Sequence, residues 1–256
     1  MVQFFVGMHQ PSDAHRVEKA CISINRIRDR KSPFKVGDWV MDSGAFTELL
    51  NHGRYRYSVA DYANAARRWI GNGNLLAIVA QDYMCEPFML AKTGMSVADH
   101  QRMTIERYDD LLDEGLPTHV MPVIQGFAPA DYANHVRQYG ARLSTGMWVG
   151  VGSVCKRQGS PRVTVSVLDA ILSIRPDLRL HGFGVKLTSL QNLAVRRRLL
   201  QRGQHGMVVR RSKAGARWQR SRGSGEVRGK GDSRRTDGGR MVAAKPIVNR
   251  IILVRR

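Results

Sequence analysis

The feature that most constrains the fold of this chain is a regular alternation of short apolar segments with longer amphipathic ones. Each apolar segment is rich in Val, Ile or aromatic residues and is too short for an amphipathic helix, which is typical of a buried strand. Six such segments span residues 3–9, 38–46, 75–83, 118–126, 147–153 and 178–186.

Helical patterns lie between these predicted strands. Ser58 and Ser96 each open one of them, and Asp61 and Asp99 follow three residues later, which predicts two capping boxes. Gly115 follows the second helix as a C-cap residue. The alternation predicts βα units and a parallel sheet, either doubly wound or rolled into a TIM-type (β/α)₈ barrel. The predicted helices span residues 58–71, 96–115, 128–143, 162–176 and 187–200.

The composition excludes several classes of protein. Three cysteines, Cys21, Cys85 and Cys155, form no CxxC pair. They fit reduced thiols in a cytoplasmic protein better than a disulfide framework, and they predict no cysteine-rich zinc site. No run of about 18 apolar residues exists, so we expect no membrane span. The N-terminus has no basic segment followed by an apolar one, so we expect no signal peptide.

The positive charge of the chain is concentrated in its last quarter. The net charge is +20, and residues 199–256 hold 16 Lys and Arg against 3 Asp and Glu. Residues 1–198 hold 25 basic and 18 acidic residues and are only mildly basic. We therefore expect a folded α/β portion over 1–198 and a basic Arg/Gly-rich tail over 199–256, which is either disordered or the translation of a wrong reading frame. Within the tail, the segment 246–254 is compatible with a short strand.

Polar or glycine residues stand at the end of five predicted strands. The carboxyl ends of parallel strands carry the chemistry in folds of this class. A single strand-end Asp more often caps a helix or forms a turn. Carboxylates and amides at successive strand ends can instead converge on one pocket and bind the polar edge of a planar heterocycle. The residues are Gly7 and His9, then 42–44, Asp82, Gln125 and Gly126, and 150–153.

Several of these segments resemble one protein family. The segment "MDSGAFTEL" resembles the DSGGF segment of the tRNA-guanine transglycosylases, and the chain is more similar to the DNA-modifying branch, DeoxyPurine in DNA protein A. The resemblance covers residues 3–198 in an order typical of that branch. It rests on "GMHQP", "DSGAFTEL", "QDYMCEP", "TGMSVADHQRMT", "IQG", "GVGSVCKRQ" and "HGFGVK".

This resemblance implies a TIM barrel and a base exchange. In the family an aspartate attacks C1′ of a guanine nucleotide, guanine leaves, and a 7-deazaguanine base such as preQ₀ replaces it. The implied substrate is DNA, with tRNA as the less favoured alternative. We expect no cofactor and no metal site among the residues of this chain. Asp42 would serve in recognition and proton transfer, Asp82 would accept from ring N–H groups, and Gln125 would contact the base carbonyl. The backbone at Gly152 and Ser153 would help to hold the base.

Other residues near these motifs keep two interpretations. His9 either contacts a phosphate or caps a strand, and Lys186 either meets a phosphate or is solvated. Turn geometry alone would explain Gly152. For Cys85 and Cys155 small buried packing residues are favoured. His100 and Gln101 lie on a predicted helix, where a structural role is favoured over a ligand role.

The chain departs from the family pattern in two places. Ala45 stands where the family has the second glycine of DSGGF. More seriously, the family places its nucleophilic aspartate on the strand after "HGFGVK", within a segment similar to "YSADSMAWS". Here the helix 187–200 leads directly into the basic tail, and no such aspartate follows. The barrel is therefore expected to be incomplete at its C-terminal end, and the chain to be inactive.

The genetic code offers an explanation for the missing segment. Codons for residues 200–215, read from the second base of the Leu200 codon, permit the translation Y-S-A-D-S-M-A-W-S-Y-A-A-R-K-Q-G. Its tryptophan is forced, because the codon of Met207 followed by any valine codon yields TGG. We therefore hypothesise that the reading frame is lost near Leu200 and that the tail is an out-of-frame translation.

Three interpretations of function follow from the sequence. The first is an enzyme that exchanges guanine for a deazaguanine base in DNA. The second is a non-catalytic nucleic-acid-binding barrel whose Arg/Gly-rich arm binds phosphates without sequence preference. The third is a broken product whose open sheet edges favour aggregation. Labelled-base incorporation separates the first from the second, because only the first requires catalysis.

Overall fold

The computed structural model describes residues 2–154, 161–185, 191–199 and 251–255. All of them belong to one of the two units into which the chain divides, residues 1–203 together with 249–256. The other unit, residues 204–248, lies outside the described residues.

Within the described residues, nine strands form a single sheet. Its order is β5-β4-β3-β2-β1-β9-β8-β7-β6. Neighbouring strands are parallel, except that β9 is antiparallel to both β1 and β8. The predicted parallel sheet is confirmed. The strands are β1 (Val2–Met8), β2 (Lys19–Ser23), β3 (Asp38–Asp42), β4 (Asn74–Val79), β5 (His119–Met121), β6 (Val123–Ile124), β7 (Trp148–Val151), β8 (Arg179–Gly182) and β9 (Ile251–Arg255).

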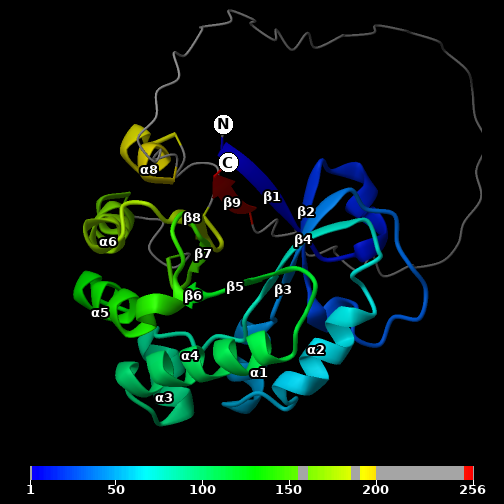
Figure 1. The fold of residues 1–256 in the computed structure, drawn as a ribbon, viewed down its shortest axis with the longest axis horizontal. Helices are drawn as coiled ribbons and strands as arrows, with labels where there is room; N and C mark the ends of the chain where they lie inside the picture. The colour runs from blue at the N-terminus through cyan, green and yellow to red at the C-terminus, as the bar shows by residue number, and fades with distance from the viewer. Residues whose placement is uncertain (1, 155–160, 186–190, 200–250, 256) are drawn as a thin grey trace, which may run out of the picture. The chain divides into compact units, whose positions relative to one another are not determined.

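The helices lie on one side of the strands, as Figure 1 shows. Alternate strand residues such as Ile22, Met41 and Ile78 pack against apolar helix residues in the larger hydrophobic cluster. The α-helices are α1 (Ala45–His52), α2 (Val59–Arg67), α3 (Pro87–Thr93), α4 (Val97–Asp113), α5 (Pro129–Tyr139), α6 (Pro161–Ile174) and α8 (Leu193–Leu199). The 3₁₀ helices are η1 (Pro11–Arg16), η2 (Ile24–Arg26) and η3 (Gly140–Arg142).

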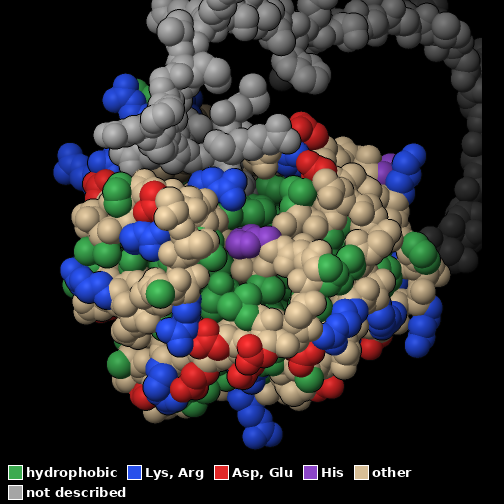
Figure 2. All heavy atoms as spheres, in the orientation of Figure 1, with side chains coloured by type: hydrophobic (Ala, Val, Ile, Leu, Met, Phe, Trp, Pro, Cys, Tyr) green, Lys and Arg blue, Asp and Glu red, His purple; other side chains and the backbone are tan. Residues whose placement is uncertain are grey.

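The opposite side of the sheet forms a second hydrophobic cluster. It contains Phe5, Val40, Val79, Val123 and Trp148, which come from strands far apart in the sheet order. The rings of Phe5 and Trp148 lie 6.0 Å apart, although β9 and β8 separate their strands. Figure 2 shows one face of the molecule, where hydrophobic side chains surround a histidine and charged side chains lie toward the edge.

One short segment of the chain supplies the strands at both ends of the sheet order. Residues 119–124 contain β5, which pairs with β4, and β6, which pairs with β7. Pro122 separates the two strands, and its carbonyl accepts a hydrogen bond of 2.8 Å from the Gly150 amide. The single predicted strand over 118–126 is therefore two strands, because proline has no N–H to donate to a ladder.

Both predicted capping boxes are confirmed. Ser58 Oγ accepts from the Asp61 amide at 3.0 Å, and Asp61 Oδ2 accepts from the Ser58 amide at 3.1 Å. Ser96 and Asp99 form the same pair of bonds. These bonds satisfy amide groups that would otherwise lack partners in the first turns of α2 and α4.

Several elements differ from the sequence prediction. Strand β2 and the short helices α1 and α3 were not predicted, and the predicted strands over 38–46 and 75–83 end earlier, at Asp42 and Val79. Gly44 adopts a left-handed φ of 73° and turns the chain directly into α1. The helix predicted over 187–200 is observed from Leu193 to Leu199, and 187–190 lie outside the described residues.

Among the described residues, the longest helices are too short or too polar to cross a bilayer.

Candidate functional site

The predicted site residues follow the carboxyl ends of neighbouring strands. Asp42 is the last residue of β3, Asp82 follows β4, Gln125 follows β6, and Gly152 and Ser153 follow β7. Because these strands are parallel, their carboxyl ends lie along the same edge of the sheet. The structure brings Asp82, Gln125 and Ser153 into a continuous hydrogen-bonded chain.

Gln125 is the centre of this chain. Its side-chain amide nitrogen donates to Asp82 Oδ2, and its Oε1 lies 2.9 Å from Ser153 Oγ. Ser153 Oγ also lies 2.9 Å from Glu86 Oε2, so the single hydroxyl proton serves one of these two acceptors at a time. The Ser43 hydroxyl donates to Asp82 Oδ1 at 3.3 Å. All these side chains are buried.

The carboxyl group of Asp82 is electrostatically unusual. Its pKa is raised from 3.8 to about 7. Burial is the largest cause and the nearby charge of Asp42 acts in the same direction, while the hydrogen bonds from Gln125 and Ser43 oppose the shift. Asp42 itself is half-buried and accepts from the Gly44 amide at 3.1 Å. A carboxyl that titrates near neutrality can change protonation when a ligand binds.

Two helices hold the backbone of Gln125. The Gln125 amide donates to His135 Nδ1 at 2.8 Å, and the Gln125 carbonyl accepts from Gln101 Nε2 at 2.7 Å. His135 Nε2 lies 3.1 Å from the Gln101 carbonyl, so the proton of the neutral imidazole resides on Nε2. Burial lowers the pKa of His135 to about 3, which keeps the ring neutral in this arrangement.

Two glycines of β7 and its following turn make room for site side chains. A Cβ at Gly152 would overlap the Gln125 side-chain amide, and a Cβ at Gly150 would overlap the Phe183 ring. Ser153, directly after Gly152, has a φ of 57°, which non-glycine residues seldom adopt. Gly152 has no positive φ, so the close approach of Gln125, and not a left-handed turn, explains the glycine.

The remaining predicted residues differ in their positions. His9 is exposed just after β1. Lys186 and Cys155 lie outside the described residues. Cys85 is fully buried, which confirms the packing interpretation. The Cys85 amide donates to Ser153 Oγ at 3.3 Å, so Cys85 adjoins the chain of site residues through its backbone. His100 is buried, with Nδ1 2.7 Å from the Met84 carbonyl and Nε2 2.7 Å from Thr93 Oγ1, which confirms its structural role.

Several residues around the site were not singled out from the sequence. Glu86 and Phe183 lie inside the family segments, so their neighbours in sequence were a usable signal, whereas Ser43 was already among the strand-end residues. Gln101 was expected to be structural, yet it directly contacts Gln125. His135 lies in none of those segments, and its role depends on the packing of α5 against β6.

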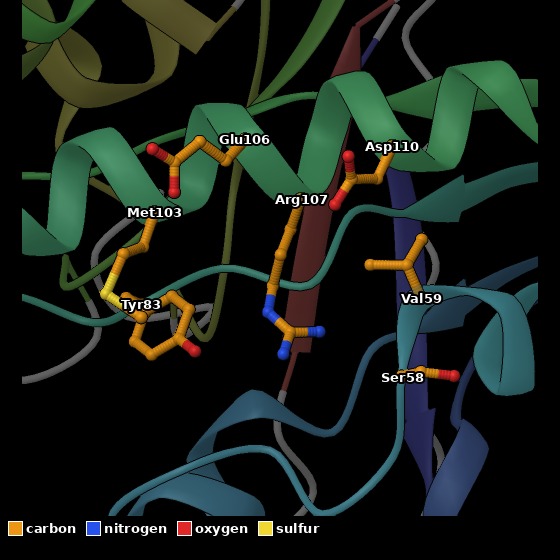
Figure 3. Close-up of a pocket in the computed structure, with 7 residues that line it drawn as sticks. All are labelled: Ser58, Val59, Tyr83, Met103, Glu106, Arg107 and Asp110. Atoms are coloured by element: carbon orange, nitrogen blue, oxygen red, sulfur yellow. The ribbon is translucent and has the colours of Figure 1, made fainter.

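A surface cavity lies beside the chain of site residues. Its volume is about 370 Å³. Figure 3 shows the Arg107 side chain extending from α4 into it, with Tyr83 nearby. Arg107 donates to Gln81 Oε1 at 2.8 Å and lies over the Tyr55 ring, and the Tyr55 hydroxyl donates to the Asp82 carbonyl at 2.8 Å. The cavity lining is Ser58, Val59, Tyr83, Met103, Glu106, Arg107 and Asp110, which includes none of the predicted site residues.

No group of three or more His, Cys, Asp and Glu side chains is placed to hold a metal ion within the described part of the chain.

Comparison with protein families identifies the chain. The family model of DpdA, DeoxyPurine in DNA protein A, matches residues 1–201. The chain belongs to this family. The resemblance recognised in the sequence motifs is thereby confirmed, and membership supports a role in the deazapurine modification of DNA. The match ends within two residues of the end of α8 and excludes most of the basic tail of this DpdA family member.

Other comparisons add little for this DpdA family member. No curated protein matches it. Among solved structures, an HMG-CoA lyase from Brucella melitensis is similar at 14% sequence identity and a TM-score of 0.43. That similarity covers 74% of this chain and 68% of the lyase chain.

Proposed function

We propose that this chain carries the base-recognition part of a transglycosylase that exchanges guanine in DNA for a 7-deazaguanine base. The observation that carries the proposal is the chain of Asp82, Gln125 and Ser153 at the strand ends. It presents carboxylate acceptors beside an amide donor. Guanine and its 7-deaza analogues offer the complementary groups, N–H donors at N1 and N2 beside a carbonyl acceptor.

Each residue takes a defined role in this proposal. Asp82 accepts from N1–H and the 2-amino group of the base. Gln125 uses one amide hydrogen to orient Asp82 and directs the other toward the base carbonyl. The backbone at Gly152 and Ser153 helps to hold the base. Asp42, whose charge already raises the pKa of Asp82, serves in recognition and proton transfer.

The protonation of Asp82 would then follow occupancy of the site. Without a base, a buried carboxyl with a pKa of about 7 is partly protonated at neutral pH. Two N–H donors from a bound base favour the ionised form, as does any hydrogen bond donated to a carboxylate. Base binding is therefore coupled to the release of a proton.

The full fold in this proposal is a (β/α)₈ barrel that is incomplete at its C-terminal end. Two observations support it: residues 119–124 pair with both β4 and β7, and side chains from distant strands meet on the inner face. Strand β9 lies between β8 and β1. The later parallel strands of a complete barrel would occupy that place, and β9 is antiparallel.

The nucleophile is the missing part of the site in this proposal. The family expectation places it on the strand after residues 181–186, where this chain instead enters the basic tail. The family match ends at residue 201, next to the point where the hidden out-of-frame segment begins. We propose that a loss of frame near Leu200 removed the aspartate and that the chain binds the base without exchanging it.

A second function has one observation in its favour. Residues 199–256 carry 16 Lys and Arg against 3 Asp and Glu, which favours non-catalytic binding of nucleic acid through phosphates. The single aromatic residue of the tail, Trp218, gives little capacity for base stacking. The observation therefore supports non-specific electrostatic binding rather than recognition of a base.

The direct test of base recognition is calorimetric titration of the chain with free guanine and preQ₀, with adenine as the control. We expect saturable binding of the first two and none of adenine, which lacks the N1–H donor. Equal binding of adenine, or no binding of any base, would contradict the proposal. Resequencing codons 195–216 tests the frame independently: codons that do not permit the hidden segment would favour the nucleic-acid-binding alternative.

A further inference from the structure

We propose that the rings of Phe46 and Phe88 stack against unpaired DNA bases that flank the target nucleotide. Together with the neighbouring Leu50 they are here termed the aromatic patch. The inference rests on the proposed function, because it takes DNA as the substrate. It adds a strand-binding surface outside the residues that recognise the base.

The aromatic patch lies next to the strand ends that carry the site. Phe46 is the second residue of α1, which starts three residues after Asp42, and Phe88 is the second residue of α3. Helix α3 begins after Glu86, whose carboxylate lies 2.9 Å from Ser153 Oγ. The two helices thus start at the edge of the sheet where Asp82 and Gln125 meet.

The members of the patch lie close together and are accessible. The Phe46 and Phe88 rings are 6.4 Å apart with an interplanar angle of 65°. Leu50 follows Phe46 by one helical turn and so lies on the same face of α1. Leu50 and Phe88 are each 40% exposed, and Phe46 is partly exposed. Single exposed apolar residues are common, whereas a contiguous group marks an interaction surface.

Two basic residues lie on or directly after the helices that carry the aromatic patch. Arg54 and Lys92 are both exposed. Lys92 follows Phe88 by one turn of α3, and Arg54 follows Gly53, the C-cap of α1, which approaches the Lys92 backbone carbonyl. The acidic residue within α1, Glu48, is buried and bonded to Arg56 at 2.8 Å. Aromatic rings beside cations are typical of surfaces that bind single-stranded nucleic acid, and this charge favours DNA over an apolar protein partner.

Base exchange creates a need for such a surface. Asp82 and Gln125 are buried, so a guanine within a duplex must leave the base stack to reach them. Its departure leaves the flanking bases without a stacking partner. Aromatic rings just outside the site can supply one, at a place where the strand must pass.

The test compares binding of a fluorescent guanine-containing single strand by wild type, Phe88→Ala, Phe88→Tyr and Phe88→Leu. The salt concentration is set high enough to suppress the non-specific electrostatic binding of the basic tail. Leu112→Ala serves as the control, because Leu112 is 44% exposed at the far end of α4. Phe46→Leu, a milder change at the partly buried position, provides a second test.

We expect Phe88→Ala and Phe88→Leu to bind the strand about tenfold more weakly, and Phe88→Tyr to bind as wild type does. Leu112→Ala should leave the affinity unchanged. Unchanged strand affinity in Phe88→Ala, or full rescue by leucine, would overturn the inference. Titration of the same variants with free preQ₀ separates the two proposals. If wild type binds preQ₀ but the Phe88 substitutions leave the affinity for the strand unchanged, only the aromatic patch is refuted. If wild type does not bind preQ₀, the proposed function is refuted.

Discussion

The side-chain amide of Gln125 donates a hydrogen bond to the carboxyl group of Asp82, a residue 43 positions earlier in the chain that follows a different strand. The amide group has two hydrogens, so this bond fixes the orientation of both side chains and leaves one donor for a ligand. Since the Gln125 backbone is held by Gln101 and His135, the donor and the acceptor are positioned before a base arrives.

The first prediction concerns the pH dependence of base affinity. If a bound base favours ionised Asp82, the affinity of wild type for preQ₀ should rise by up to about tenfold per pH unit below pH 7 and level off above it. Asp82→Asn should bind about 10- to 100-fold more weakly at pH 8, because it loses a charged acceptor. Its affinity should not change between pH 5.5 and 8. Titration calorimetry across this pH range measures both affinities. If the affinities of wild type and Asp82→Asn changed with pH in parallel, Asp82 would not be the group whose ionisation controls base binding.

The second prediction concerns stability. The folded state retains the Asp82 proton up to a pKa of about 7, whereas the unfolded chain loses it near 3.8, so the folded state binds more protons between these values. The contribution of this group to the free energy of unfolding therefore falls as pH rises from about 4 to 7. Urea unfolding should show that, as pH rises over that window, the free energy of unfolding of wild type falls relative to that of Asp82→Asn.

Buried histidines act in the opposite direction. The pKa values of His135 and His181 are lowered to about 3 by burial, against 6.5 in an unfolded chain. The unfolded state binds their protons first, so wild type and Asp82→Asn alike should lose stability as pH falls below about 6.5. Only the difference in the free energy of unfolding between the two proteins reports on Asp82. If that difference does not vary with pH, the raised pKa of Asp82 is contradicted.

The third prediction uses the close approach at Gly152. A methyl group there would overlap the Gln125 side-chain amide, so Gly152→Ala should displace Gln125 and abolish base binding. Overpacking of this kind costs about 1–3 kcal/mol of stability. Gly71→Ala is the matched control, because open space surrounds Gly71 and its backbone is not left-handed. Base binding retained by Gly152→Ala would place the site elsewhere.

The fourth prediction concerns the support of Gln125. His135→Leu removes the acceptor of the Gln125 amide and the donor to the Gln101 carbonyl. The Gln125 amide is then buried without an acceptor, which costs about 1–3 kcal/mol and which thermal unfolding would detect. Base affinity should fall as well, because Gln125 is no longer fixed.

A purely structural role for His135 makes a different prediction. In that case His135→Leu would lower stability while the folded protein bound preQ₀ with wild-type affinity and the same pH dependence. His52→Leu is the control, since His52 is exposed at the end of α1 and should affect neither measurement.

The sequence predicted the parts of the structure that depend on local pattern. The alternation of apolar and helical segments predicted the parallel sheet, and Ser58 with Asp61 predicted a helix start that the structure confirms. The family segments brought Asp82, Gln125 and Ser153 into one hypothesis before their contacts were known. Each of these signals lies within a few residues of the feature that it predicts.

Features that depend on distant contacts were missed. Strand β2 has only five residues, and its place is set by pairing with β1 and β3 rather than by its own pattern. Helix α1 depends on the left-handed turn at Gly44. His135 looks like any helix residue until α5 packs against β6, and the pairing of β9 with β1 joins segments from opposite ends of the chain.

We propose that this chain retains base recognition but lacks the nucleophile. The most direct test is incorporation of labelled preQ₀ into guanine-containing DNA by the chain as it stands and by a version whose frame is restored near Leu200. We predict incorporation by the restored protein alone, and its loss when the aspartate of the restored Y-S-A-D segment is replaced by asparagine. Incorporation by the present chain, or none by a restored protein that binds preQ₀, would contradict the account.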